Sequence, residues 1–267
     1  MMETSSTSEQ TLRLCDTHSH ISFKQFDHDR ERIISQLKNG ELEFLIEIGI
    51  DLETSKKVVE LASKHENIFA AIGIHPHESN DTPSNYTEEM GILAEYKTVV
   101  AIGEIGLDYY RNLSPKEIQK RVFREQLFLS RELKLPVVVH VRDAYDDAYE
   151  IIKEFKGELH GVIHAFSGTI ADAKRFVDLG FKLGIGGPLT YPKNNELREI
   201  VRHFSLVHFL SETDCPYLPP QKYRGKRNEP AYVRFVIELI SELKGISASS
   251  CSTILCKNAI DLFKLQI

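Results

Sequence analysis

The feature of this 267-residue chain that most constrains its fold is a regular alternation of short apolar runs with longer amphipathic stretches. The short runs predict strands buried on both faces, as in a parallel sheet, at residues 12–17, 44–49, 68–74, 98–104, 136–141, 160–165, 180–185 and 206–212. The longer stretches carry apolar residues at helical spacing and predict helices at 28–38, 53–65, 116–134, 143–155, 170–179, 194–203, 230–243 and 248–264, with a weaker one around 87–96.

Eight strands that alternate with helices indicate an α/β fold, either a closed (β/α)8 TIM barrel or a doubly wound sheet. The number of strands favours the barrel, and the absence of a GxGxxG motif after the first run weakens a dinucleotide-binding fold. Such a barrel takes about 250 residues, so we expect a single domain over residues 11–267. Residues 1–10 (MMETSSTSEQ) are polar, lack the apolar core of a signal peptide and are predicted to be a disordered tail.

Composition and charge narrow the function classes. The net charge of −6 is not that of a protein that binds nucleic acid mainly through phosphate contacts, so such a substrate needs a local basic patch or bound metal. No apolar run approaches the roughly 20 residues of a membrane span, and nothing indicates an obligate protein partner. Four cysteines without a CxxC pair indicate a reducing compartment, so the cytoplasm is the expected location, with nuclear entry left open.

Side chains that can bind metal ions end six of the predicted strands. They are His18 and His20, His75, Glu104, His140, His164, and Glu212 with Asp214. The functional groups of (β/α)8 barrels lie at the carboxyl ends of the strands, so these side chains should meet at one mouth. Six of them would be the ligands: His18, His20, Glu104, His140, His164 and Asp214. Six nitrogen and oxygen ligands exceed the needs of one tetrahedral zinc and suit two divalent metal ions such as Mg, Mn or Zn.

Single members of this set have simpler explanations. An isolated histidine in an apolar segment is more often a core residue than a ligand, and this alternative stays open for His75. Glu104 alone could pair with Arg142, and Asp214 alone could cap a helix or a turn. For the six ligands together a purely structural role is a poor explanation, because buried polar groups are costly unless they are partnered.

Several stretches resemble motifs of the TatD family of metal-dependent deoxyribonucleases, within the amidohydrolase-like metal hydrolases. They are DTHSHI (16–21), GIHPH (73–77), GEIGLDYY (103–110), HVRDA (140–144), HAFSG (164–168), ETDCPYL (212–218) and GKRNEP (225–230), in the order expected for the family. The resemblance implies a (β/α)8 barrel that uses divalent metal to hydrolyse phosphodiester bonds. It further implies a 3′ to 5′ exonuclease on single-stranded DNA and, in some members, RNA.

The resemblance also implies roles for individual residues. One metal would be held by His18, His20, Glu104 and Asp214, and the second by Glu104 as the bridge, His140 and His164. His75 would line the pocket near the phosphate. The expected catalytic residues are Asp214, as the general base that accepts a proton from the attacking water, and Glu104.

Substrate contacts are predicted less sharply. Arg142 lies two residues after His140 and could bind phosphate bidentately or pair with Glu104 or Glu212, and the structural pairing is slightly favoured. Tyr109 is a candidate for stacking on a base. Arg224 lies in a basic segment at 222–227, which could be a solvated loop or could bind the backbone of the strand. Asn228 could anchor that loop or touch substrate.

Two other functions stay open. The same scaffold could hydrolyse an amide or an ester, for example as a D-aminoacyl-tRNA deacylase, because fold does not determine substrate. Against an amide hydrolase, the fourth strand carries Glu104 where a carbamylated lysine could otherwise bridge two metals. The chain could also be a binding protein without catalysis, but such proteins usually lose metal ligands, and all six are present here.

Overall fold

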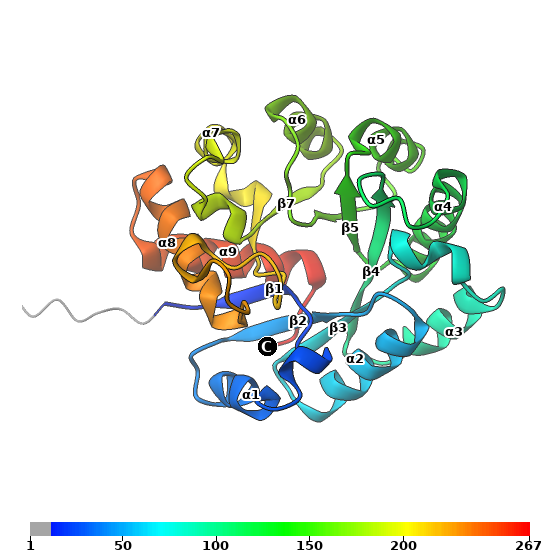
Figure 1. The fold of residues 1–267 in the computed structure, drawn as a ribbon, viewed down its shortest axis with the longest axis horizontal. Helices are drawn as coiled ribbons and strands as arrows, with labels where there is room; N and C mark the ends of the chain where they lie inside the picture. The colour runs from blue at the N-terminus through cyan, green and yellow to red at the C-terminus, as the bar shows by residue number, and fades with distance from the viewer. Residues whose placement is uncertain (1–11) are drawn as a thin grey trace, which may run out of the picture.

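The computed structural model describes residues 12–267, so the predicted tail at 1–10 lies outside the described residues. One parallel sheet contains eight strands in the order of the chain, and the helices lie around it (Figure 1). The strands are β1 (Cys15–Ser19), β2 (Phe44–Ile48), β3 (Ile68–Ile72), β4 (Val99–Asp108), β5 (Val137–Arg142), β6 (Gly161–Ile163), β7 (Lys182–Ile185) and β8 (Phe209–Ser211). The α-helices are α1 (Arg30–Lys38), α2 (Leu52–Lys64), α3 (Tyr86–Leu93), α4 (Lys116–Leu133), α5 (Tyr145–Lys153), α6 (Ile170–Asp178), α7 (Asn195–His203), α8 (Val233–Lys244) and α9 (Ala248–Phe263).

The sheet closes on itself where the segment after β8 meets the end of β1. The backbone N–H of Asp214 donates to the carbonyl oxygen of His18 at 2.9 Å, and the N–H of His20 donates to that of Cys215 at 2.9 Å. A parallel bridge between Ser19 and Cys215 completes this seam. Closure confirms the single-domain (β/α)8 barrel and excludes the doubly wound alternative.

Local sequence explains where the helices begin and which side they bury. Asp51 accepts a hydrogen bond from the backbone of Thr54 and starts α2 with a capping box. The buried positions of α2, Ser55, Val58, Val59 and Ala62, follow helical spacing and face the sheet. Each helix that the sequence predicts is observed. The helix predicted at 230–243 begins three residues later, as α8 at Val233, because residues 230–232 form a short 3-10 turn.

The last helix covers the end of the barrel at which the strands begin. Within α9, Ser252 donates to the carbonyl oxygen of Arg13 just before β1, and Asn258 donates to that of Phe209 at the start of β8. Cys256 and Phe263 of the same helix pack into a buried cluster with the first residues of the strands. The opposite end, where the strands finish, is left for the site. No helix in residues 12–267 is long and apolar enough to cross a membrane.

One strand is longer than predicted. The sequence predicts that the fourth strand ends at Glu104, whereas β4 continues to Asp108. Its pairing with β5 shifts register between Ile102 and Ile105, so Glu104 lies at an irregular point within the strand. Because alternate residues of a strand share a face, Asp108 belongs to the same side of the sheet as Glu104.

Candidate metal centre

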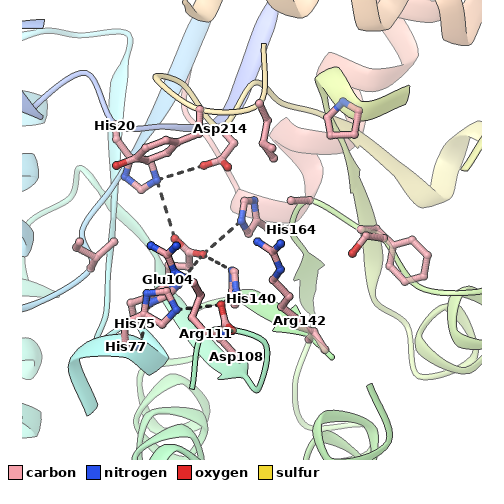
Figure 2. A pocket seen from close by; sticks show the side chains of 18 of the residues that line it. His20, His75, His77, Glu104, Asp108, Arg111, His140, Arg142, His164 and Asp214 are labelled. Carbon is pink, nitrogen blue, oxygen red and sulfur yellow. Dashed lines mark hydrogen bonds and ion pairs between the residues drawn. The ribbon is translucent and has the colours of Figure 1, made fainter. Parts of the chain in front are cut away.

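The carboxyl ends of the strands surround a pocket of about 580 Å³ that holds the predicted metal ligands (Figure 2). Its lining includes His20 from the end of β1, Glu104 from β4, His140 from β5, His164 after β6 and Asp214 after β8. His18 lies beneath them and is fully buried. The structure therefore brings all six predicted ligands together from five different strands.

Glu104 lies at the centre of this cluster and uses its two carboxylate oxygens for different neighbours. Oε1 is 2.9 Å from Nδ1 of His140 and 3.3 Å from Nε2 of His164. Oε2 is 3.4 Å from Nε2 of His18 and 4.0 Å from Nε2 of His20. The carboxylate therefore contacts imidazoles on both sides of the cluster and can act as a ligand to divalent metal.

Asp214 completes the half of the cluster formed by His18 and His20. Its Oδ1 is 3.5 Å from Nε2 of His20 and 3.8 Å from Nε2 of His18. The residue has a left-handed backbone with φ of 58°, and the seam with β1 fixes it. Asp16 supports this seam from below, because its carboxylate accepts hydrogen bonds from the backbone N–H groups of His18 and Thr213.

Three groups of side chains have ligand atoms within 4.8 Å of one another. They are His18 with His20 and Asp214; His18 with Glu104 and His164; and His75 with Glu104 and His140. The rings of His18 and His164 are stacked, with centroids 3.6 Å apart. Donor atoms on both sides of Glu104 are therefore close enough to hold divalent metal.

The partner of one nitrogen of a histidine determines whether the other nitrogen is a free lone pair. Nδ1 of His20 lies 3.1 Å from the carbonyl oxygen of Ile48, which can only accept, so Nδ1 carries the proton. Nε2 of His20 then faces Nε2 of His18, 3.2 Å away, as a lone pair. Ligand atoms that converge in this way are typical of a cation site.

Buried carboxylates orient two further imidazoles. Nδ1 of His164 lies 3.2 Å from Oε1 of Glu212, which leaves its Nε2 as the lone pair toward Glu104. Nε2 of His140 lies 3.2 Å from Oδ2 of Asp108, which leaves its Nδ1 as the lone pair toward Glu104. Lone pairs that face a carboxylate repel it unless a cation lies between them, so this donor set fits divalent metal.

His75 differs from the predicted ligands in the direction of its proton. Its Nδ1 accepts a hydrogen bond from the backbone N–H of His77 at 3.1 Å, so the proton of the neutral ring is on Nε2. That Nε2 lies 3.5 Å from Oε1 of Glu104 and faces the pocket. Burial lowers the pKa of His75 well below its usual value, which keeps the ring neutral. His75 can therefore donate a hydrogen bond into the site.

The electrostatics of the site favour ionised carboxylates. Without metal, protonated imidazoles supply the positive charge: burial opposes ionisation of Glu104, but these charged rings, with His164 the strongest, hold its pKa well below the usual value. Burial likewise opposes ionisation of Asp214, but the contact with His20 and the positive charge of protonated His164, His18 and His20 together outweigh it and lower the pKa. Both groups are negatively charged at neutral pH, as metal ligands need to be.

Asp108 and Glu212 orient ligands and were not among the predicted site residues. Asp108 was missed because the sequence predicts that the fourth strand ends at Glu104. The sequence did carry a signal, since Glu104, Gly106 and Asp108 alternate along one face of a strand. Glu212 was noted at a strand end, but only the structure shows that it contacts His164.

Arg142 lines the pocket and does not form the pairing that the sequence slightly favoured. Within residues 12–267 its guanidinium makes no ion pair with Glu104 or Glu212, so that expectation is wrong. The guanidinium stacks on the ring of Tyr110 with 4.0 Å to the centroid. Figure 2 shows Arg142 on the same side of the cluster as Arg111 and Asp108.

The other predicted substrate contacts lie outside the pocket lining. The hydroxyl of Tyr109 donates to Asp147 at 2.6 Å. Arg224 stacks on Tyr191, 4.3 Å from the centroid. Asn228 is fully buried, and its amide donates to two loop carbonyl oxygens. It therefore anchors the loop, which is one of the two roles that the sequence predicts for it.

Comparisons with known proteins agree with this geometry. The family model described as "TatD related DNase" matches residues 15–264. The metal-dependent hydrolase YabD of Bacillus subtilis is 39% identical and is matched over 95% of this chain and 100% of its own length. The 3′-5′ ssDNA/RNA exonuclease TatD of Pectobacterium parmentieri is 32% identical, and the match covers 94% of this chain and 99% of that protein. The crystal structure of the TatD homologue YJJV from Escherichia coli superposes with a TM-score of 0.90 at 31% identity, covering 96% of this chain and 100% of that one. This chain belongs to the TatD-related DNase family and is a metal-dependent hydrolase.

Proposed function

We propose that this protein is a metal-dependent exonuclease that removes nucleotides from the 3′ end of single-stranded DNA, with RNA as a second substrate. The observation that carries the proposal is the convergence of imidazole nitrogens on both oxygens of Glu104. Two sets of residues would hold two divalent ions there, with His18, His20 and Asp214 on one side and His140 and His164 on the other. Such ions supply Lewis-acid charge and make a water molecule more acidic.

The residues of the chain have separate tasks in the proposed reaction. Glu104 holds the two halves of the site together through its two oxygens. Oδ1 of Asp214 accepts the proton of the attacking water, because this carboxylate lies at the edge of the pocket and is ionised. Nε2–H of His75 donates to a phosphoryl oxygen and so orients the scissile bond and stabilises the developing charge.

Several features support a phosphodiester substrate over an amide or an ester. The family name and the name of the Pectobacterium relative, a ssDNA/RNA exonuclease, both concern nucleic acid. Phe23 and Tyr217 line the pocket and offer aromatic rings on which bases can stack. Tyr217 is 49% exposed and is therefore accessible to a strand that enters from solvent.

The test is a substrate panel with one matched pair of variants. A 5′-labelled single-stranded oligonucleotide, a D-aminoacyl ester of tRNA and a simple amide are each incubated with metal-loaded protein. We expect the oligonucleotide to shorten from its 3′ end and the other substrates to remain. Glu104→Gln should abolish shortening, whereas Glu53→Gln, an exposed residue of α2, should leave it unchanged. Hydrolysis of the ester or amide with an intact oligonucleotide would replace this proposal with the alternative.

A further inference from the structure

Two arginines at the mouth of the pocket lack a protein partner for their charge. Arg111 and Arg142 both line the pocket and are exposed to solvent. In the part of the chain that the structure describes, neither guanidinium has a hydrogen bond or an ion pair, and Arg142 has only the ring of Tyr110 against it. Arginine is the side chain best suited to bind phosphate bidentately.

Arginines elsewhere in the described chain are mostly satisfied by the protein. Arg227 binds both carboxylate oxygens of Asp29, and Arg30 binds backbone carbonyl oxygens of the loop after β1. Arg175 bridges two acidic residues across neighbouring helices. A protein with a net charge of −6 offers many acidic side chains with which an arginine can pair. Guanidiniums that remain without an ion pair beside this pocket therefore indicate that they bind an anionic ligand.

The backbone explains how both side chains come to lie at the mouth. Arg142 pairs in register with Asp108, and it follows His140 by two residues, which places it about 6.6 Å further out on the same face. Arg111 is held in the turn after β4 because its backbone N–H donates to Oδ1 of Asp108 at 2.8 Å. Figure 2 shows His140 between the two arginines in this view.

The position of the two arginines at the mouth of the pocket separates them from the metal ligands. A phosphate held on the floor of the pocket would contact Glu104 and its neighbours through metal, whereas the arginines stand at the rim. The stack on Tyr110 holds the guanidinium of Arg142 while leaving its N–H groups free to donate. Tyr110 is 61% exposed and could also contact a base.

We propose that Arg111 and Arg142 form a second phosphate subsite, which binds the phosphate next to the scissile one on the retained strand. The inference rests on the proposed function and narrows its substrate class to strands with at least two phosphodiester linkages. A dinucleotide fills only the floor of the pocket, whereas a trinucleotide also occupies the rim. The subsite would also hold the strand in register for removal of one nucleotide at a time.

The first test is the salt dependence of binding to metal-loaded protein. A fluorescein-labelled pentathymidylate with phosphorothioate linkages, which resists cleavage, is titrated at several salt concentrations and followed by anisotropy. Each phosphate contact to a single strand contributes about 0.7 to the slope of log K against log salt. We expect Arg111→Gln with Arg142→Gln to reduce the slope by about 0.7, because the two arginines together bind one phosphate. Arg121→Gln with Arg124→Gln, which removes the same charge from the outer face of α4, should leave the slope unchanged.

The second test uses cleavage. In the wild type, kcat/KM for a thymidine trinucleotide should exceed that for the dinucleotide, and the double variant at the pocket should reduce this ratio by about tenfold. An unchanged salt slope in the double variant would overturn the subsite, whether or not strands are cleaved. An arginine-dependent slope without cleavage of either substrate would keep the subsite and overturn the nuclease. Cleavage of both substrates with equal efficiency by wild type and double variant would overturn the subsite and keep the nuclease.

Discussion

Replacing Asp108 with asparagine changes one atom and should weaken metal binding. Oδ2 of Asp108 is 3.2 Å from Nε2 of His140 and 2.9 Å from Nε2 of His77, while Oδ1 accepts the backbone N–H of Arg111. The carboxylate thus accepts from three donors at once. An asparagine side chain has a single oxygen and cannot do so in either of its two orientations.

Each orientation of the new amide has a definite cost. If the amide nitrogen faces His140, it forces the proton of the neutral ring onto Nδ1, which removes the lone pair that faces Glu104. If the nitrogen faces Arg111, two donors oppose each other within the turn after β4. Loss of a carboxylate that orients a metal-binding histidine costs roughly 10- to 100-fold in metal affinity or activity, which is about 1.4–2.7 kcal/mol.

The assay is competition for metal against a chelator, together with kcat/KM on an oligonucleotide. Asp147→Asn is the matched control, since this carboxylate accepts from Tyr109 and pairs with Lys120 outside the pocket. We expect Asp108→Asn to lose metal affinity within the stated range at an unchanged melting temperature, and the control to keep it. Wild-type affinity and activity in Asp108→Asn would refute the claim that Asp108 determines the tautomer of His140.

Three further predictions follow from single contacts. Gly184→Ala should weaken metal binding by about tenfold, because a Cβ there would lie 2.2 Å from Oε2 of Glu212 and would displace the carboxylate that orients a ligand; unchanged chelator competition would contradict this. Asn228→Ala should lower the free energy of unfolding by about 1–3 kcal/mol in urea, because two loop carbonyl oxygens lose their donor; a smaller loss would mean that water replaces the amide. Arg227 holds the pKa of Asp29 far below its usual value through a bidentate hydrogen bond, so Arg227→Gln should cost about 1 kcal/mol at pH 7. This difference should shrink as the pH falls below about 4, where Asp29 is protonated in the unfolded chain, and a difference that is constant with pH would refute it.

Much of the fold could be predicted because the apolar periodicity directly reflects burial. Strands such as β2 and β3 are buried on both faces, so their sequences are nearly continuous apolar runs, and the helices between the strands show an apolar stripe. The polar residues that end those runs identify the site, because the ends of parallel strands in a barrel converge. His18 and Asp214 are nearly 200 residues apart in the chain and still meet for this reason.

The partners of the ligands were harder to predict because they depend on register and on loop geometry. Asp108 contacts His140 only because β4 runs past an irregularity and pairs with β5 up to Arg142. Likewise, the sequence could not decide whether Arg142 forms an ion pair within the protein, because that depends on which groups lie within reach of its long, flexible side chain. The roles of Tyr109 and Asn228 were determined by neighbours from distant segments, such as Asp147, which leave no local signal.

The measurement that tests the central claim most directly is a titration of Mn²⁺ into metal-stripped protein. Metal binding and the shortening of a 5′-labelled single-stranded oligonucleotide are followed in the same samples. The account predicts 3′-end shortening that grows with bound metal, saturates near two ions per chain and is lost in Asp214→Asn, which keeps its fold. Protein that binds Mn²⁺ and leaves the oligonucleotide intact would contradict the account.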